Sequence, residues 1–128
     1  MPFIMAKVNQ KLSGQQRRRL KAGLGQAISA VPGKSESVLM VGIDDQYDLY
    51  LRGDNQQPLA YLSVAIYGTP HHEGYPDLNL AITKLFYDVL HVQPDNLFID
   101  YQDVMAWGTN GYFIDEQGIH VPDDLGDE

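Results

Sequence analysis

Two residues near the start of the chain, Pro2 and Lys34, have types and positions suited to acid–base chemistry. Pro2 opens an apolar run, residues 1–9, that is typical of a buried strand. If Met1 is removed, which a small second residue permits, Pro2 becomes a free secondary amine. An α-amine titrates at roughly 7.7 to 8.0, and burial or a nearby cation lowers that pKa. Pro2 could then act as a base near neutral pH. The alternative is that Pro2 merely starts a strand, because an amide-bonded proline has no basic nitrogen.

Lys34 is the cation that could complement this amine. It follows the helix-stopping pair Pro32-Gly33 and precedes a second apolar run, residues 38–43. Strand, helix and strand in this order form a βαβ unit, whose parallel strands start at the same sheet edge. Pro2 and Lys34 should therefore be neighbours. A lysine there could bind a carboxylate and lower the pKa of the Pro2 amine, whereas the plainer interpretation is an exposed loop lysine.

Two helices and four strands must position these residues. Residues 13–31 carry one apolar stripe of Leu20, Leu24, Ile28 and Val31, with Ser13 as the expected N-cap. The pattern then repeats after about 58 to 60 residues, with a strand at 59–67, a helix at 76–91 and a strand at 97–101. Two such βαβ units predict an α/β domain (α+β in some schemes). Its four-stranded sheet has both helices on one face, and partner subunits cover the other face.

Composition restricts the class of protein. The 128 residues predict a single domain over 1–114 and an acidic extension over 115–128, which holds six of the seventeen acidic residues. The net charge of −8 argues against nucleic acid as a partner. The chain has no run long enough to cross a membrane and no signal-peptide pattern, so we expect a cytoplasmic protein. It has no cysteine, which excludes disulfides and thiolate metal sites. His71-His72-Glu73 lacks metal-site spacing, so no metal is expected.

Several short motifs occur together in a characteristic order. They are Met1-Pro2-Phe3-Ile4, Gly33-Lys34, Gly53 with Pro58, Tyr67-Gly68, residues 93–101 and residues 107–113. With them, the chain resembles the tautomerase superfamily, and within it the macrophage migration inhibitory factor (phenylpyruvate tautomerase) branch. The resemblance runs from Met1 to about Phe113 and leaves only the acidic extension unmatched.

The resemblance implies a homotrimer with an active site at each subunit boundary and no cofactor. It implies that Pro2 is the general base, that Lys34 binds the substrate carboxylate, and that the Tyr67 backbone amide helps to hold it. It also implies that Trp107 and Phe113 lie near the pocket. The predicted activity is keto–enol tautomerisation of a small aromatic α-keto acid such as phenylpyruvate.

The sequence departs from the family pattern at two expected pocket positions. Phe98 and Asp100 stand where the family commonly has tyrosine and asparagine; the first loses a hydroxyl, and the second adds a carboxylate that would repel an anionic substrate. The Cys-x-x-Cys motif of the cytokine members is replaced by residues 59–62.

The alternative to a tautomerase is a non-catalytic signalling or binding trimer. A third possibility, hydratase-type chemistry, would need more arginines near Pro2 than Arg52.

Overall fold

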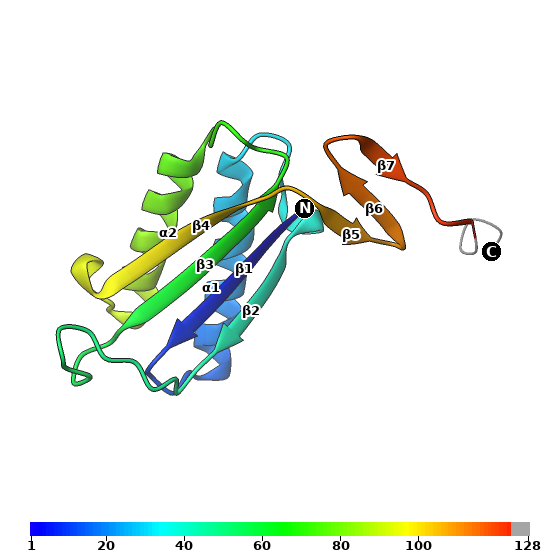
Figure 1. The fold of residues 1–128 in the computed structure, drawn as a ribbon. Coiled ribbons are helices and arrows are strands. Elements are labelled where there is room, and N and C mark those ends of the chain that lie inside the picture. Colours follow the sequence, from blue (N-terminus) through cyan, green and yellow to red (C-terminus); the bar gives the residue numbers. More distant parts are fainter. Residues whose placement is uncertain (124–128) are drawn as a thin grey trace.

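The computed structural model describes residues 1–123 and contains the βαβ unit twice. The first unit is β1 (Pro2–Val8), α1 (Gly14–Ala27) and β2 (Met40–Asp44), and the second is β3 (Ala60–Tyr67), α2 (Tyr75–Leu90) and β4 (Leu97–Val104). The sheet order is β2-β1-β3-β4. Each unit pairs its own strands in parallel, and the two units join through antiparallel β1 and β3. Both helices cover one face (Figure 1), so the predicted fold is confirmed.

The core lies between the sheet and the helices. Alternate residues of β1 and β3 are buried, as a strand with one covered face requires: Ile4, Ala6, Val8, Leu62, Val64 and Ile66. The predicted stripe of α1 is buried in full. In α2, Phe86 is fully buried, whereas Leu85 is only partly buried and packs on Gly23 of α1.

The helix ends follow local sequence rules. The Ser13 hydroxyl accepts a hydrogen bond from the Gln16 amide at 3.0 Å, and the Gln16 side chain accepts one from the Ser13 amide at 2.9 Å, which completes a capping box. The predicted helix of residues 13–31 is in fact α1 followed by a 3₁₀ turn, Ile28–Ala30. A second 3₁₀ turn, Glu36–Val38, shortens the second predicted strand from its N-terminal side.

A small second sheet follows β4. It consists of β5 (Trp107–Thr109), β6 (Tyr112–Asp115) and β7 (Gly118–His120), and it projects from the main body in Figure 1. We call residues 107–123 the arm. The Tyr67 hydroxyl donates to the Asp115 carbonyl at 3.2 Å and ties the arm to β3. The predicted extension, residues 115–128, thus begins at the end of β6, and its residues 124–128 lie outside the described part of the chain.

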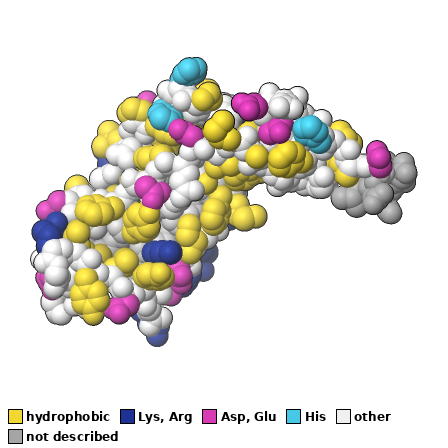
Figure 2. Space-filling view, in the orientation of Figure 1, with side chains coloured by type: hydrophobic (Ala, Val, Ile, Leu, Met, Phe, Trp, Pro, Cys, Tyr) yellow, Lys and Arg dark blue, Asp and Glu magenta, His cyan; other side chains and the backbone are white. Residues whose placement is uncertain are grey.

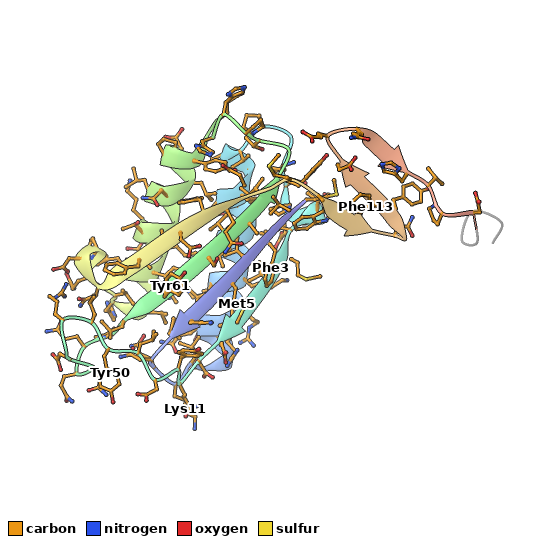
Figure 3. All side chains as sticks on the ribbon, viewed as in Figure 1. Phe3, Met5, Lys11, Tyr50, Tyr61 and Phe113 are labelled. Atoms are coloured by element: carbon orange, nitrogen blue, oxygen red, sulfur yellow. The ribbon has the colours of Figure 1, made fainter. Side chains whose placement is uncertain are left out.

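The sheet face opposite the helices is open in the single chain. Its side chains include Phe3, Met5 and Tyr61, which Figure 3 labels on this side. Figure 2 shows apolar side chains spread across the strands of this face. Over residues 1–123, no helix combines the length and apolar character needed to cross a membrane.

Candidate active site

The start of the chain is fixed at one end of the sheet. Pro2 is buried and pairs with Ile66 near the end of β3. One residue further out, the Met1 carbonyl accepts a hydrogen bond from the Tyr67 amide at 3.3 Å. The first residues are therefore part of the sheet, as a strand that begins at a terminus requires.

Lys34 lies beside this terminus. Its amide donates to the Val31 carbonyl at 3.1 Å, in the turn that follows α1, and its half-buried side chain lies close enough to the Met1 amine for its charge to act on it. The ammonium also lies against Gly68, where an added Cβ would be 3.8 Å from Nζ. Gly68 has a φ of 93°, a left-handed conformation that suits glycine and turns the chain at the end of β3. Chain start, Lys34 and residues 67–68 thus form one cluster.

The cluster lowers the basicity of the terminal amine. Burial is the larger cause and the Lys34 cation the second, and together they lower the pKa of the Met1 amine to about 6. At pH 7 this amine is mostly neutral and can accept a proton. When Met1 is present, its carbonyl also occupies the Tyr67 amide, the group that the resemblance assigns to a substrate carboxylate.

A cavity of about 290 Å³ adjoins the cluster. Its walls are residues 66–70 at the end of β3, residues 103–105 at the end of β4, and Glu116 from the arm. Tyr67 and Gly68 belong to both the cavity and the cluster. The single chain therefore provides a largely apolar space beside its terminal amine.

An aromatic stack supports the loop on the outer side of this cavity. The ring of Tyr75 stacks between His72, at 4.9 Å, and Tyr101, at 5.2 Å, and the His72 imidazole pairs with Asp103 at 2.7 Å. Burial, together with the nearby Tyr75, raises the pKa of Tyr101 to about 12, so its hydroxyl stays neutral and hydrogen-bonds to Asn79. The stack fixes residues 69–75, which include His71, His72 and Glu73.

Phe98 and Asp100 lie away from this cluster within one chain. Pro2, Ile66 and Asp103 share one row across the sheet, whereas Phe98 lies five residues earlier in β4. At about 3.3 Å per residue this places Phe98 roughly 16 Å along the strands from the Pro2 row. Its side chain is 57% exposed. A single chain does not bring Phe98 and Pro2 into one pocket.

Asp100 is held by its own sheet. Its carboxylate accepts hydrogen bonds from the Tyr61 hydroxyl and, at 2.7 Å, from the Ser63 hydroxyl, and these two bonds lower the pKa of Asp100. Sequence reasoning missed both donors. The alternation of β3 does put Tyr61 and Ser63 on one face, but their pairing with Asp100 depends on the β3–β4 register, which sequence alone does not provide.

The two remaining predicted residues belong to the arm. Trp107 pairs with Ile114 across β5 and β6, and Phe113 packs its ring against His120 at 5.6 Å. Phe113 is 49% exposed, and Figure 3 shows it on the arm, beyond the end of the sheet.

Fold and geometry together define an α/β domain of two βαβ repeats with a chain-terminal amine at the start of the central strand β1. No family model and no curated protein sequence matches the chain. Solved structures do match its fold. Leishmania major MIF2 is 23% identical with a TM-score of 0.78, and the match covers 87% of this chain and 95% of that one.

Two further structures show the same architecture. The macrophage migration inhibitory factor homologue from Prochlorococcus marinus is 19% identical with a TM-score of 0.74, covering 85% of this chain and 96% of that one. The structure of Pt0534 inactivated by 2-oxo-3-pentynoate is 15% identical with a TM-score of 0.74, and the match covers 85% of this chain and 93% of that one. The chain therefore has the macrophage migration inhibitory factor fold, and the resemblance seen in the sequence is confirmed at that level.

Proposed function

We propose that the chain, once Met1 is removed, is a tautomerase that interconverts the keto and enol forms of a small aromatic α-keto acid such as phenylpyruvate. One observation carries the proposal: a partly buried chain-terminal amine of low pKa lies beside Lys34 and is bonded through the Met1 carbonyl to Tyr67, which lines a cavity. A neutral amine and a cation in that relation suit a substrate that has an acidic C–H bond near a carboxylate.

The reaction needs one base and one anion-binding group. The Pro2 nitrogen takes a proton from the carbon next to the carbonyl; that C–H bond breaks, an N–H bond forms, and the electron pair moves to the carbonyl oxygen. The same proton then passes to that oxygen and gives the enol. Lys34 pairs with the carboxylate, and the Tyr67 amide, freed by the loss of Met1, donates to it. No cofactor takes part in the proposed reaction.

The inhibitor in the Pt0534 structure supports this substrate class. Its name, 2-oxo-3-pentynoate, describes a ketone next to a carboxylate, as in phenylpyruvate. A protein of the same fold therefore reacts with a 2-oxo acid. Pt0534 is 15% identical to this chain, so a 2-oxo acid as the substrate of this chain is part of the proposal.

We also propose that the active form is a homotrimer. The open sheet face carries Phe3, Met5 and the exposed Met40, and a second copy would remove these apolar side chains from water. A second copy would also supply Phe98 and Asp100, which the single chain holds far from Pro2. Trp107 and Phe113 would close the same intersubunit pocket from the arm.

A chain that keeps Met1 favours the second candidate, a non-catalytic binding trimer. In that chain Pro2 is amide-bonded, and the Met1 carbonyl occupies the Tyr67 amide. The intact mass of protein isolated from its native source separates the two candidates. The cytoplasmic location expected from the sequence is also a proposal, which fractionation of native cells would test.

The test of the proposed chemistry follows enol–keto interconversion of phenylpyruvate by ultraviolet absorbance. Protein without Met1 is compared with its Pro2→Ala variant, also without Met1. We expect the variant to lose about 10²-fold in rate, the lower end of what a positioned general base contributes, since alanine keeps an amine but not the ring. An unchanged rate would show that Pro2 is not the base.

A further inference from the structure

The cavity near the terminal amine carries negative charge on part of its wall. Among the described residues that line it, the charged ones are Asp103, near the end of β4, and Glu116, on the arm. Both are exposed, so a ligand in the cavity can reach them. The cation of the cluster, Lys34, lies instead beside the Met1 amine and Gly68. Opposite charges therefore stand at different places around one small space.

The Asp103 carboxylate is held in place by its neighbours. Its Oδ2 atom pairs with the His72 imidazole at 2.7 Å, and that ring stacks on Tyr75 at 4.9 Å. Tyr75 is only 7% exposed, and in the described structure its hydroxyl has no hydrogen-bond partner. Burial and, second, the charge of Asp103 raise the pKa of Tyr75. Asp103 is therefore a positioned charge that acts on the groups around it.

The same carboxylate lies within reach of a ligand that contacts the amine. Pro2, Ile66 and Asp103 share one row across β1, β3 and β4. Two strand spacings of about 4.8 Å place the Asp103 backbone roughly 10 Å from that of Pro2. The cavity volume of about 290 Å³ is at the small end for ligand sites. A ligand with a single ring therefore cannot occupy this space without facing the carboxylates.

From this arrangement we infer that the site selects a 2-oxo acid whose aromatic ring carries a positively charged group, such as an amine, at the end away from its carboxylate. Lys34 pairs with the carboxylate of this ligand, and Asp103 and Glu116 pair with its cation. A second carboxylate at that end is repelled by both residues. Phenylpyruvate, which is neutral there, is a substrate but not the best one.

The inference rests on the proposed function, because it takes Lys34 as the site of the ligand carboxylate. Asp103 and Glu116 then determine specificity, and His72 positions Asp103. In the proposed homotrimer, the Asp100 carboxylate that a second copy would supply has the same sign. Assembly should therefore strengthen the selection for a cation.

Binding of unreactive ligands tests the inference without turnover. 3-Phenylpropanoate keeps the carboxylate and the ring but has no ketone, and its para position can carry an aminomethyl, a hydroxymethyl or a carboxyl group. Titration calorimetry at pH 8, on the full chain without Met1, measures the three affinities. We expect the cationic ligand to bind roughly tenfold more tightly than the neutral one, since two exposed ion pairs can each contribute about threefold. The second carboxylate should weaken binding by a similar factor.

Charge-neutralising variants assign the preference to its residues. Asp103→Asn with Glu116→Gln keeps the shape of both side chains and should reduce the ratio between the cationic and the doubly anionic ligand from about 100 to about 3. Glu116→Gln alone, at an exposed position, should reduce it about tenfold and serves where the double variant does not fold. Asp88→Asn is the matched control, because Asp88 is an exposed carboxylate near the other end of α2, and it should keep the full ratio. Circular dichroism verifies the fold of each variant.

The outcomes separate this inference from the proposed function. Equal affinities for the three ligands overturn the selection, while turnover of phenylpyruvate by the same protein leaves the proposed function standing. A full ratio that persists in the folded double variant overturns the roles of Asp103 and Glu116. The expected order of affinities in a chain that does not turn over phenylpyruvate supports the selection and overturns the proposed chemistry alone.

Discussion

At the residue scale, the chemistry depends on the charge state of one nitrogen. Burial and Lys34 lower the pKa of the Met1 amine in the structure, and we propose that the same two influences act on the Pro2 nitrogen once Met1 is removed. Both disfavour the protonated form, so both lower the pKa of a free Pro2 amine. The Asp100 carboxylate accepts hydrogen bonds from Tyr61 and Ser63, which lower its pKa and keep it charged, so its repulsion of an anionic substrate stays a prediction.

The first residue-scale prediction concerns Lys34. Lys34→Ala removes a cation from the Pro2 amine, so the amine pKa rises and the acid limb of the pH profile of kcat/KM moves to higher pH. The loss of the carboxylate partner should also raise KM more than it lowers kcat. Steady-state kinetics with phenylpyruvate between pH 5 and 9 measures both effects.

Lys84→Ala is the matched control for this prediction, because Lys84 is an exposed lysine on α2. Its profile should coincide with that of the parent chain. An acid limb that stays in place in Lys34→Ala would show that this lysine does not tune the amine.

At the element scale, the site is held by the junction between the two βαβ units. Gly74, just before α2, approaches the turn that follows α1 so closely that an added Cβ would be 2.0 Å from the Ala30 carbonyl oxygen. Its φ of 81° is also a left-handed conformation. This contact fixes the loop of residues 68–74 that follows β3 and lines part of the cavity.

Gly74→Ala should therefore destabilise the protein by roughly 2 to 6 kcal/mol, since backbone strain and overpacking each cost roughly 1 to 3 kcal/mol. Gly53→Ala is the control. Gly53 has a similar φ of 75° but no atom within 4 Å of an added Cβ, so only the strain of about 1 to 2 kcal/mol applies. Urea unfolding measures the difference, and equal losses would disprove the close contact.

The sequence predicts which helices and strands form better than it predicts the register in which the strands pair. Apolar stripes and turn residues identified both βαβ units, and the rule for parallel strands led to the expectation that Pro2 and Lys34 lie together. Two features escaped prediction for physical reasons. Strand register depends on pairing between distant segments, so the bonds of Tyr61 and Ser63 to Asp100 could not be foreseen. β7 has three exposed residues and no buried face to give it an apolar pattern.

At the scale of the whole molecule, one chain does not bring all of the proposed site residues together. Pro2, Lys34 and Tyr67 lie together, whereas Phe98 lies about five residues away along the sheet and Phe113 lies on the projecting arm. The apolar open face of the sheet gives a further reason for a second copy to bind.

Turnover should therefore depend on assembly. On dilution below the concentration at which sedimentation shows dissociation, the activity per chain should fall in parallel with the trimer fraction, because the proposed pocket takes residues from two copies. Added inert protein such as albumin controls for adsorption at low concentration. Constant activity per chain in a verified monomer would contradict the intersubunit site.

The central claim is that an unblocked Pro2 nitrogen is the base, and the presence of Met1 tests it most directly. Protein with Met1 removed is compared with protein made while methionine aminopeptidase is inhibited, each verified by intact mass. Both are assayed for phenylpyruvate enol–keto interconversion under the same conditions. The account predicts turnover only in the preparation that lacks Met1, and equal turnover in the two would contradict it.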